Sequence, residues 1–246
     1  MAKERVYIYK QYERFWHWTQ AFLVLFLALT GFEVHGSFSF FGFEAAADLH
    51  NKAAWAFIIL TVFTIFWHFT TGEWRQYLPT TKNLKAQAEY YIFGIFRNAP
   101  HPTRKTVLVK LNPLQRLVYL SLKILVFPVM VFSGLAYMFY RYQSNGSIQS
   151  FELASLEKIA WAHTLGAYIL VAFVIVHVYL ITTGHTISSN LKAMITGWEE
   201  IESDVDDTSQ NQDPLKPQKK VISEIPEPGK EDLKKNNFPP NPSKKT

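Results

Sequence analysis

Long apolar runs separated by polar segments fill the chain up to about residue 187. Four of the runs are roughly 20 residues long, the length that a helix needs to cross the hydrocarbon of a bilayer. They cover about residues 15–34, 53–71, 117–140 and 159–183. Aromatic rings of the kind that sits at lipid headgroups flank them: Trp16, Trp74, Tyr140 and Trp161. The pattern predicts four transmembrane helices, because too little polar sequence remains to cover them in a soluble protein.

The composition changes near residue 199. From there to residue 246 the chain is polar and rich in Pro, Lys, Glu and Asn, with almost no aromatic residues. Such a segment buries too little apolar surface to offset the entropy lost on ordering. We therefore expect an all-α, integral membrane four-helix bundle over residues 1–198 and a disordered polar tail over residues 199–246.

The distribution of Lys and Arg orients the four helices. Positive residues are dense before the first run and between the second and third runs. They are Lys3, Arg5, Lys10, Arg14, and then Arg75, Lys82, Lys85, Arg97, Arg104, Lys105 and Lys110. The other two connections carry only Lys52, Arg141 and Lys158. Because positive residues stay in the cytoplasm, we expect a multi-pass membrane protein with both termini cytoplasmic. The net charge of +5 then reflects topology and not nucleic-acid binding.

The chain has no cysteine and eight histidines. The absence of cysteine excludes cysteine-ligated iron–sulfur clusters, disulfides and covalently attached c-type haem. A redox cofactor would therefore need other ligands, and a histidine inside a membrane span is a functional candidate because its burial is costly.

His163 and His177 lie in the fourth run, fourteen residues apart. In a helix that spacing is about 40° short of four turns, so both side chains share one face, roughly 21 Å apart along the axis. This separation suits two haems stacked across a bilayer. One isolated buried histidine is often only a hydrogen-bonded core residue, but two levels of histidines favour haem ligation.

Each haem iron needs a second histidine from a neighbouring helix, and the topology supplies one at each level. His50 opens the second span on the outer side and can face His163, whereas His17 opens the first span on the cytoplasmic side and can face His177. Gly31 lies fourteen residues after His17, at the level of the outer haem, where a missing side chain would let the porphyrin approach the backbone.

His68 is an alternative ligand to His17. It follows His50 by eighteen residues, five turns along the same face, but the rise of about 27 Å matches the fourth helix less well. His35 and His101 fall in expected loops, and His185, just past the last span, could hydrogen-bond a haem propionate or a quinone.

Several motifs resemble one family. They are Arg14-Phe15-Trp16-His17-Trp18 with Thr30-Gly31, then Leu49-His50, the His163 to His177 spacing, and Lys192-Ala193-Met194-Ile195-Thr196-Gly197. Together they resemble the bacterial di-haem cytochrome b subunits that anchor membrane-bound hydrogenases, respiratory formate dehydrogenases and thiosulfate reductases. The resemblance covers roughly residues 5–200 and implies a location in the bacterial cytoplasmic (inner) membrane.

The resemblance implies two haem b groups, the inner one on His17 and His177 and the outer one on His50 and His163. It also implies a quinone, menaquinone or ubiquinone, that exchanges electrons near the inner haem, with Asn112 at the position of a residue lining that site. We therefore expect an electron-transfer subunit of an oxidoreductase complex. Its extracytoplasmic partner would be a hydrogenase, a molybdenum enzyme, an iron–sulfur protein or a multihaem cytochrome.

The chain departs from the family pattern at Lys123, in the third span, and at the longer link that carries His185. Lys123 could pair with a haem propionate or a bound semiquinone, or its long stem could reach the cytoplasmic surface. We keep Asn112, Lys123 and His185 as candidate quinone-site residues.

A second class of function is a membrane metal enzyme or transporter that uses histidines without haem. Such proteins cluster their ligands at close spacings or carry carboxylates within the membrane, and the second and third runs hold no carboxylate. A third reading is a structural anchor that has lost its haems. The reduced-minus-oxidised visible spectrum separates all three.

Overall fold

The computed structural model describes residues 3–97, 99–103, 109–142, 153–184 and 186–202. Within this part of the chain, four helical segments are long and apolar enough to cross a membrane, and they coincide with the four predicted runs. They are Gln11–Val34, Phe43–Thr71, Pro113–Phe139 and Leu156–Ile181. Their apolar side chains point outward: Phe22, Phe66 and Ile175 are 65%, 67% and 65% exposed. Such faces require lipid around them.

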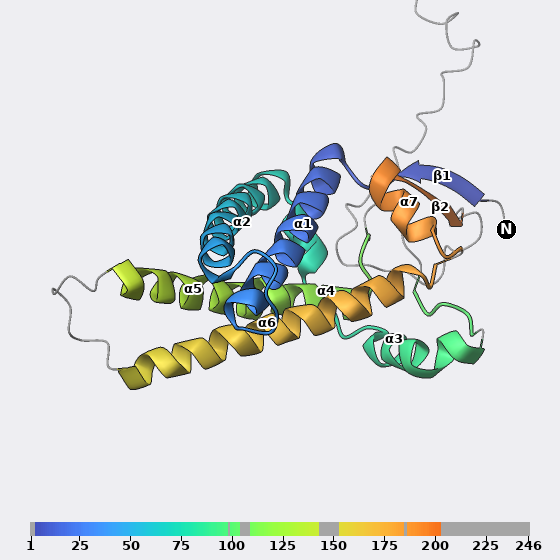
Figure 1. Ribbon diagram of the computed structural model, residues 1–246. Coiled ribbons are helices and arrows are strands. Elements are labelled where there is room, and N and C mark those ends of the chain that lie inside the picture. Colours follow the sequence, from blue (N-terminus) through green and yellow to red (C-terminus); the bar gives the residue numbers. More distant parts are fainter. Residues whose placement is uncertain (1–2, 98, 104–108, 143–152, 185, 203–246) are drawn as a thin grey trace, which may run out of the picture. The chain divides into compact units, whose positions relative to one another are not determined.

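Helix α1 (Gln11–Val34) packs along helix α2 (Phe43–Thr71), as Figure 1 shows. Their contact centres on the buried side chains of Leu23, Ala53 and Phe57. The small side chain of Ala53 allows the two helix backbones to approach closely, which is how membrane helices commonly associate.

Helix α2 begins at Phe43, about ten residues before the predicted span. Polar residues end the apolar run, but they do not end the helix, because Ala45–Ala47 favour helix strongly. The turn before α2 is organised by the Glu33 carboxylate at the end of α1. Its Oε1 atom accepts three backbone N–H bonds of 2.7 Å, from Phe40, Phe41 and Gly42.

The third span consists of α4 (Pro113–Ser121), the π-helix η4 (Leu122–Val126) and α5 (Phe127–Tyr142). The π-helical turn has a readable cause: Pro128 has no N–H to donate and its ring crowds the preceding turn. Asn112 caps the span by accepting a 2.8 Å bond from the Gln115 N–H, and proline follows it at the first helical position.

Helix α6 (Leu153–Ile181) packs beside α5 (Figure 1). Gly166 makes this approach possible, since a Cβ atom there would lie 2.5 Å from the Met130 sulfur. The described residues between α2 and α4 include four short helices: η1 (Glu73–Tyr77), α3 (Leu84–Glu89), η2 (Tyr90–Gly94) and η3 (Ile95–Arg97).

The two ends of this domain pair with each other. Strand β1 (Lys3–Tyr7) and strand β2 (Trp198–Glu202) are antiparallel, and α7 (Ser189–Thr196) precedes β2. The N–H groups of Ile8 and Tyr9 both donate to the Gly197 carbonyl. We call β1, β2 and α7 the terminal clasp. It adds a small sheet to the expected all-α fold.

The clasp also bears on the predicted tail. Residues 199–202 form part of β2, because a partner strand 195 positions away supplies the backbone hydrogen bonds that a local reading cannot anticipate. The rest of the predicted tail, residues 203–246, lies outside the described residues.

Candidate histidine pairs

His17 and His177 lie opposite each other. His17 is in the second turn of α1 and His177 is in the last turns of α6. Their ring centroids are 6.2 Å apart, with the ring planes at 48°. The His177 ring also stacks on Phe173, one turn earlier on α6, at 5.4 Å and 21°.

His50 and His163 form a second facing pair. His50 lies two turns inside α2 and His163 lies in the first part of α6. Their ring centroids are 6.3 Å apart and the ring planes make an angle of 70°. All four ligand candidates are half-buried, and α6 contributes one histidine to each pair.

Both separations suit an iron ion between the rings. Two metal–nitrogen bonds of about 2.0 Å, with about 1.1 Å from each bonded nitrogen to its ring centre, place two imidazole centroids roughly 6.2 Å apart. Directly hydrogen-bonded imidazoles would lie closer, with centroids roughly 5 Å apart, because such a hydrogen bond spans only about 2.9 Å.

Two glycines make room beside the second pair. A Cβ atom at Gly31 would lie 3.1 Å from His50 Cε1, and one at Gly134 would lie 3.3 Å from His163 Cε1. Gly31 therefore lies at the predicted level, against the imidazole of His50. Gly134 was not anticipated from the sequence, because a glycine in an apolar run carries no marker of a neighbour on another helix.

The first pair shows a different sign of a missing group. The Nδ1 atom of His17 is buried and meets no hydrogen-bonding group among the residues that the structure describes. Buried polar atoms normally have a partner. The spacing of both pairs, the glycine clearances and this orphaned nitrogen together fit two bis-histidine haems.

His68, the alternative ligand to His17, forms its hydrogen bonds with residues other than the four paired histidines. Its Nδ1 is 2.7 Å from the Thr64 carbonyl and its Nε2 is 3.3 Å from the Tyr77 hydroxyl and 3.3 Å from Lys123 Nζ. Both ring nitrogens are thus engaged within the protein. Of the two candidates, His17 is the one that the structure places opposite His177.

Lys123 lies in an aromatic cage. Its Nζ atom is 3.3 Å from the centre of the Tyr77 ring and 5.1 Å from that of Trp16, and it contacts His68 Nε2. The ammonium is therefore held by neutral groups on three other segments. Trp16 directly precedes His17 on α1, so the cage lies at the same end of that helix as the first histidine pair.

The other predicted residues have local roles or fall outside the described part. The Asn112 side chain, which caps α4, also donates to the Tyr91 hydroxyl at 2.8 Å. Tyr119, on the same span, has its ring centroid 6.4 Å from that of His177. His35 and His101 are exposed, as expected for loops, and His185 is outside the described residues.

A charged cluster lies at the same ends of the helices as the first pair. Lys110 Nζ is 2.7 Å from Glu13 and 3.3 Å from Glu73, and Lys10 Nζ is 2.8 Å from Glu73. Burial alone would raise the pKa of Glu73, but the hydrogen bond from Lys10 and the charge of Lys110 hold that pKa below 4.5. Burial raises the pKa of the Tyr77 hydroxyl above 10.0.

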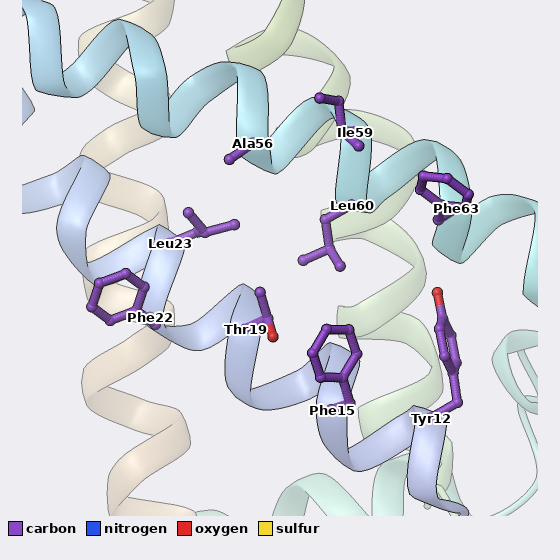
Figure 2. Close-up of a pocket in the computed structure, with 9 residues that line it drawn as sticks. All are labelled: Tyr12, Phe15, Thr19, Phe22, Leu23, Ala56, Ile59, Leu60 and Phe63. Atoms are coloured by element: carbon purple, nitrogen blue, oxygen red, sulfur yellow. The ribbon is translucent and has the colours of Figure 1, made fainter.

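Two other kinds of site find no support. Within the described residues, no group of three or more His, Asp or Glu side chains could hold a metal ion directly. A groove of about 560 Å³ runs between α1 and α2 (Figure 2), but it contains none of the histidines. Its walls are apolar, apart from Thr19 and the Tyr12 hydroxyl.

The sequence is similar to those of proteins named as cytochromes. The chain is 27% identical over 205 residues to an Escherichia coli (strain K12) protein whose name describes it as a cytochrome, YdhU. That match covers 79% of this chain and 75% of the relative. Two further relatives are each named as a probable Ni/Fe-hydrogenase B-type cytochrome subunit. The one from Rhizobium leguminosarum bv. viciae is 25% identical, covering 80% of this chain and 90% of the relative. The one from Cupriavidus necator is 28% identical, covering 70% and 77%.

No solved structure matches the chain. The sequence profile of the family described as Prokaryotic cytochrome b561 matches residues 8–197. This range contains all four facing histidines and all four membrane helices. The chain therefore belongs to the prokaryotic cytochrome b561 family.

Proposed function

We propose that this cytochrome holds two haem b groups, one between His17 and His177 and one between His50 and His163. Through them it carries electrons between a quinone and an extracytoplasmic redox partner. The observation that carries the proposal is the recurrence of one spacing, 6.2 and 6.3 Å, at two histidine pairs that share helix α6.

Family membership already makes the chain a membrane-embedded b-type cytochrome of electron transport. The proposal adds the number of haems, their ligands and their arrangement. When bound, each haem would supply one-electron chemistry between ferric and ferrous iron. The protein would hold the two sites at different depths, since fourteen residues of α6 separate His163 from His177, a rise of roughly 21 Å.

The charge distribution supports cytoplasmic termini. Lys10, Arg14 and Lys110 lie at the ends of the helices that carry the first pair, and the segment between α2 and α4 is rich in Lys and Arg. Under the positive-inside rule this end faces the cytoplasm. His17 and His177 would then form the inner site, and His50 and His163 the outer one.

The quinone would exchange electrons at the inner site. Lys123 supports this placement, because its ammonium contacts Trp16, Tyr77 and His68 at the end of α1 that carries His17, and these described contacts are neutral groups. Such a cation favours an oxygen ligand that gains negative charge. Asn112 and His185 remain further candidates. The charged cluster of Lys10, Glu13, Glu73 and Lys110 would connect this region to water for proton exchange.

The names of two relatives favour a hydrogenase as the partner. A molybdenum enzyme, an iron–sulfur protein or a multihaem cytochrome would use the outer site equally well. Because the quinone and the partner would meet opposite faces, turnover would move charge across the membrane.

Haem analysis of the purified protein tests the proposal. We expect two haem b per chain and two components in the reduced-minus-oxidised spectrum. His50→Ala and His163→Ala should remove the same component, and His17→Ala and His177→Ala the other. His101→Ala is the matched control, because its exposed ring should leave both unchanged. One haem per chain would contradict the pairing. So would loss of the same spectral component in His163→Ala and in His177→Ala.

The quinone assignment has a separate test. Lys123→Met should slow reduction of the inner component by a quinol, while reduction by dithionite stays complete. If quinol reduces the variant at the wild-type rate, Lys123 has no part in the quinone site.

A further inference from the structure

The two histidines of the second pair each face a hydroxyl group. Thr30 Oγ1 is 3.0 Å from His50 Nδ1, and Ser133 Oγ is 2.8 Å from His163 Nδ1. Each hydroxyl residue directly precedes the glycine that clears space for the same imidazole, Gly31 in one case and Gly134 in the other. One arrangement thus occurs twice, between α1 and α2 and between α5 and α6.

The backbone fixes the direction of these hydrogen bonds. The Thr30 hydroxyl is 2.8 Å from the Phe26 carbonyl, and the Ser133 hydroxyl is 2.5 Å from the Val129 carbonyl. A carbonyl oxygen can only accept, so each hydroxyl uses its single hydrogen there. The hydroxyl oxygen must then accept from the histidine, which requires a proton on Nδ1.

A second backbone carbonyl lies near each hydroxyl. The Leu27 oxygen is 3.4 Å from Thr30 Oγ1, and the Met130 oxygen is 3.3 Å from Ser133 Oγ. The hydroxyl hydrogen therefore has backbone acceptors on its own helix and is not available to the histidine. This favours the histidine tautomer that carries its proton on Nδ1 and leaves the Nε2 lone pair free to bind iron.

The first pair lacks this arrangement at His17. The Nδ1 atom of His17 is buried and finds no partner among the described residues. The protein thus orients the ligands of one site by hydrogen bonds and does not treat the His17 ligand in the same way.

We infer that Thr30 and Ser133 are positioning residues that fix the tautomer of both axial ligands of the His50–His163 haem and lower its reduction potential. The inference rests on the proposed function. A hydrogen bond that a ligand imidazole donates through its second nitrogen makes the ligand more basic. A more basic ligand stabilises ferric iron over ferrous iron. Both hydroxyls act on one haem, so the two haems should be separated in potential by this device.

Substitutions that remove the hydroxyl but keep the shape provide the test. The variants are Thr30→Val, Ser133→Ala and their combination, with Thr30→Ser as the variant that keeps the hydroxyl. Thr61→Val and Ser121→Ala are matched controls. Thr61 and Ser121 also donate to the carbonyl four residues earlier, but neither hydrogen-bonds a histidine in the described part of the chain. The readouts are a redox titration of both b-type components and haem content per chain.

We expect Thr30→Val and Ser133→Ala each to raise the potential of one component and to leave the other in place. A tenfold change in the ferric-to-ferrous ratio corresponds to a shift of about 59 mV for one electron. Haem affinity at that site should fall roughly 10- to 100-fold. Thr30→Ser should keep the wild-type reduction potential, because it retains the hydroxyl.

The outcomes separate this inference from the proposed function. Failure to find two b-type components in the wild type would overturn the proposed function itself. Two normal components that stay unmoved in Thr30→Val and Ser133→Ala would overturn only the inference. Equal shifts of both components, or the same shift in Thr61→Val, would also overturn it, because they would indicate a general loss of packing.

Discussion

Lys110→Met should destabilise the cytochrome strongly. Lys110 is only 6% exposed and its ammonium touches two carboxylates, at 2.7 Å on Glu13 and 3.3 Å on Glu73. Removing it leaves Glu73 with Lys10 as its ion-pair partner and takes away the ion pair that Lys110 forms with Glu13. Breaking a buried ion pair from one side typically costs about 3–5 kcal/mol, and we expect a loss of that order.

The pH dependence of stability gives a second readout of the same change. The folded-state pKa of Glu73 is lowered from 4.5. The ionised Glu73 side chain therefore adds to the free energy of unfolding above that value, and this stabilisation is lost as the pH falls through the lowered pKa. The pKa of Lys10 is raised from 10.5 by its hydrogen bond to Glu73, so its contribution is lost as the pH rises above 10.5. Without Lys110 the pKa of Glu73 should rise, and acid destabilisation should begin at a higher pH.

Chemical unfolding in detergent, followed from about pH 2 to about pH 8, measures both effects. Lys85→Met is the control. Lys85 and Glu89 are largely exposed and their charged atoms lie 3.6 Å apart, so the loss of this pair should not measurably change the free energy of unfolding. Glu13→Gln combined with Lys110→Met should be less damaging than the sum of the two single changes. Wild-type stability in Lys110→Met, or an unchanged acid limb, would refute the ion-pair reasoning.

Three further predictions concern other parts of the molecule. His68→Ala should keep both haem components, because the His68 ring nitrogens bond within the protein; loss of a haem would instead make it a ligand. Gly134→Val should remove much of the component bound by His163, since even a Cβ would lie 3.3 Å from that ring, and full haem content would contradict the clearance. Gly197→Ala should open the terminal clasp, because φ is 86° and a Cβ would lie 2.7 Å from the Tyr9 carbonyl. Unchanged hydrogen exchange of β1 would count against this.

The sequence was sufficient for the features that repeat locally. Apolar runs of bilayer length located the four spans, and the 3.6-residue period put His163 and His177 on one face of α6. The preference for His17 over His68 rested on helix rise, which His68 matched less well, and on the family resemblance. The structure places the ring centroids of His17 and His177 6.2 Å apart.

Features that depend on contacts between distant residues could not be read in the same way. Nothing around Lys110 indicates that it meets Glu13, 97 residues earlier. Ser133 and Gly134 look like ordinary members of an apolar run until α6 is placed beside them. The π-helical turn before Pro128 has a local cause instead, because a proline within a helix removes one backbone hydrogen bond.

The two histidine pairs are held by different means. His50 and His163 face helices α1 and α5, which supply hydroxyl groups and glycine clearances directly. His17 and His177 lie where α1 begins and α6 ends. There the terminal clasp supplies the restraint. Arg14 donates to the Ile195 carbonyl and Trp18 to the Met194 carbonyl, so the start of α1 is bound to the segment that follows α6, on either side of His17.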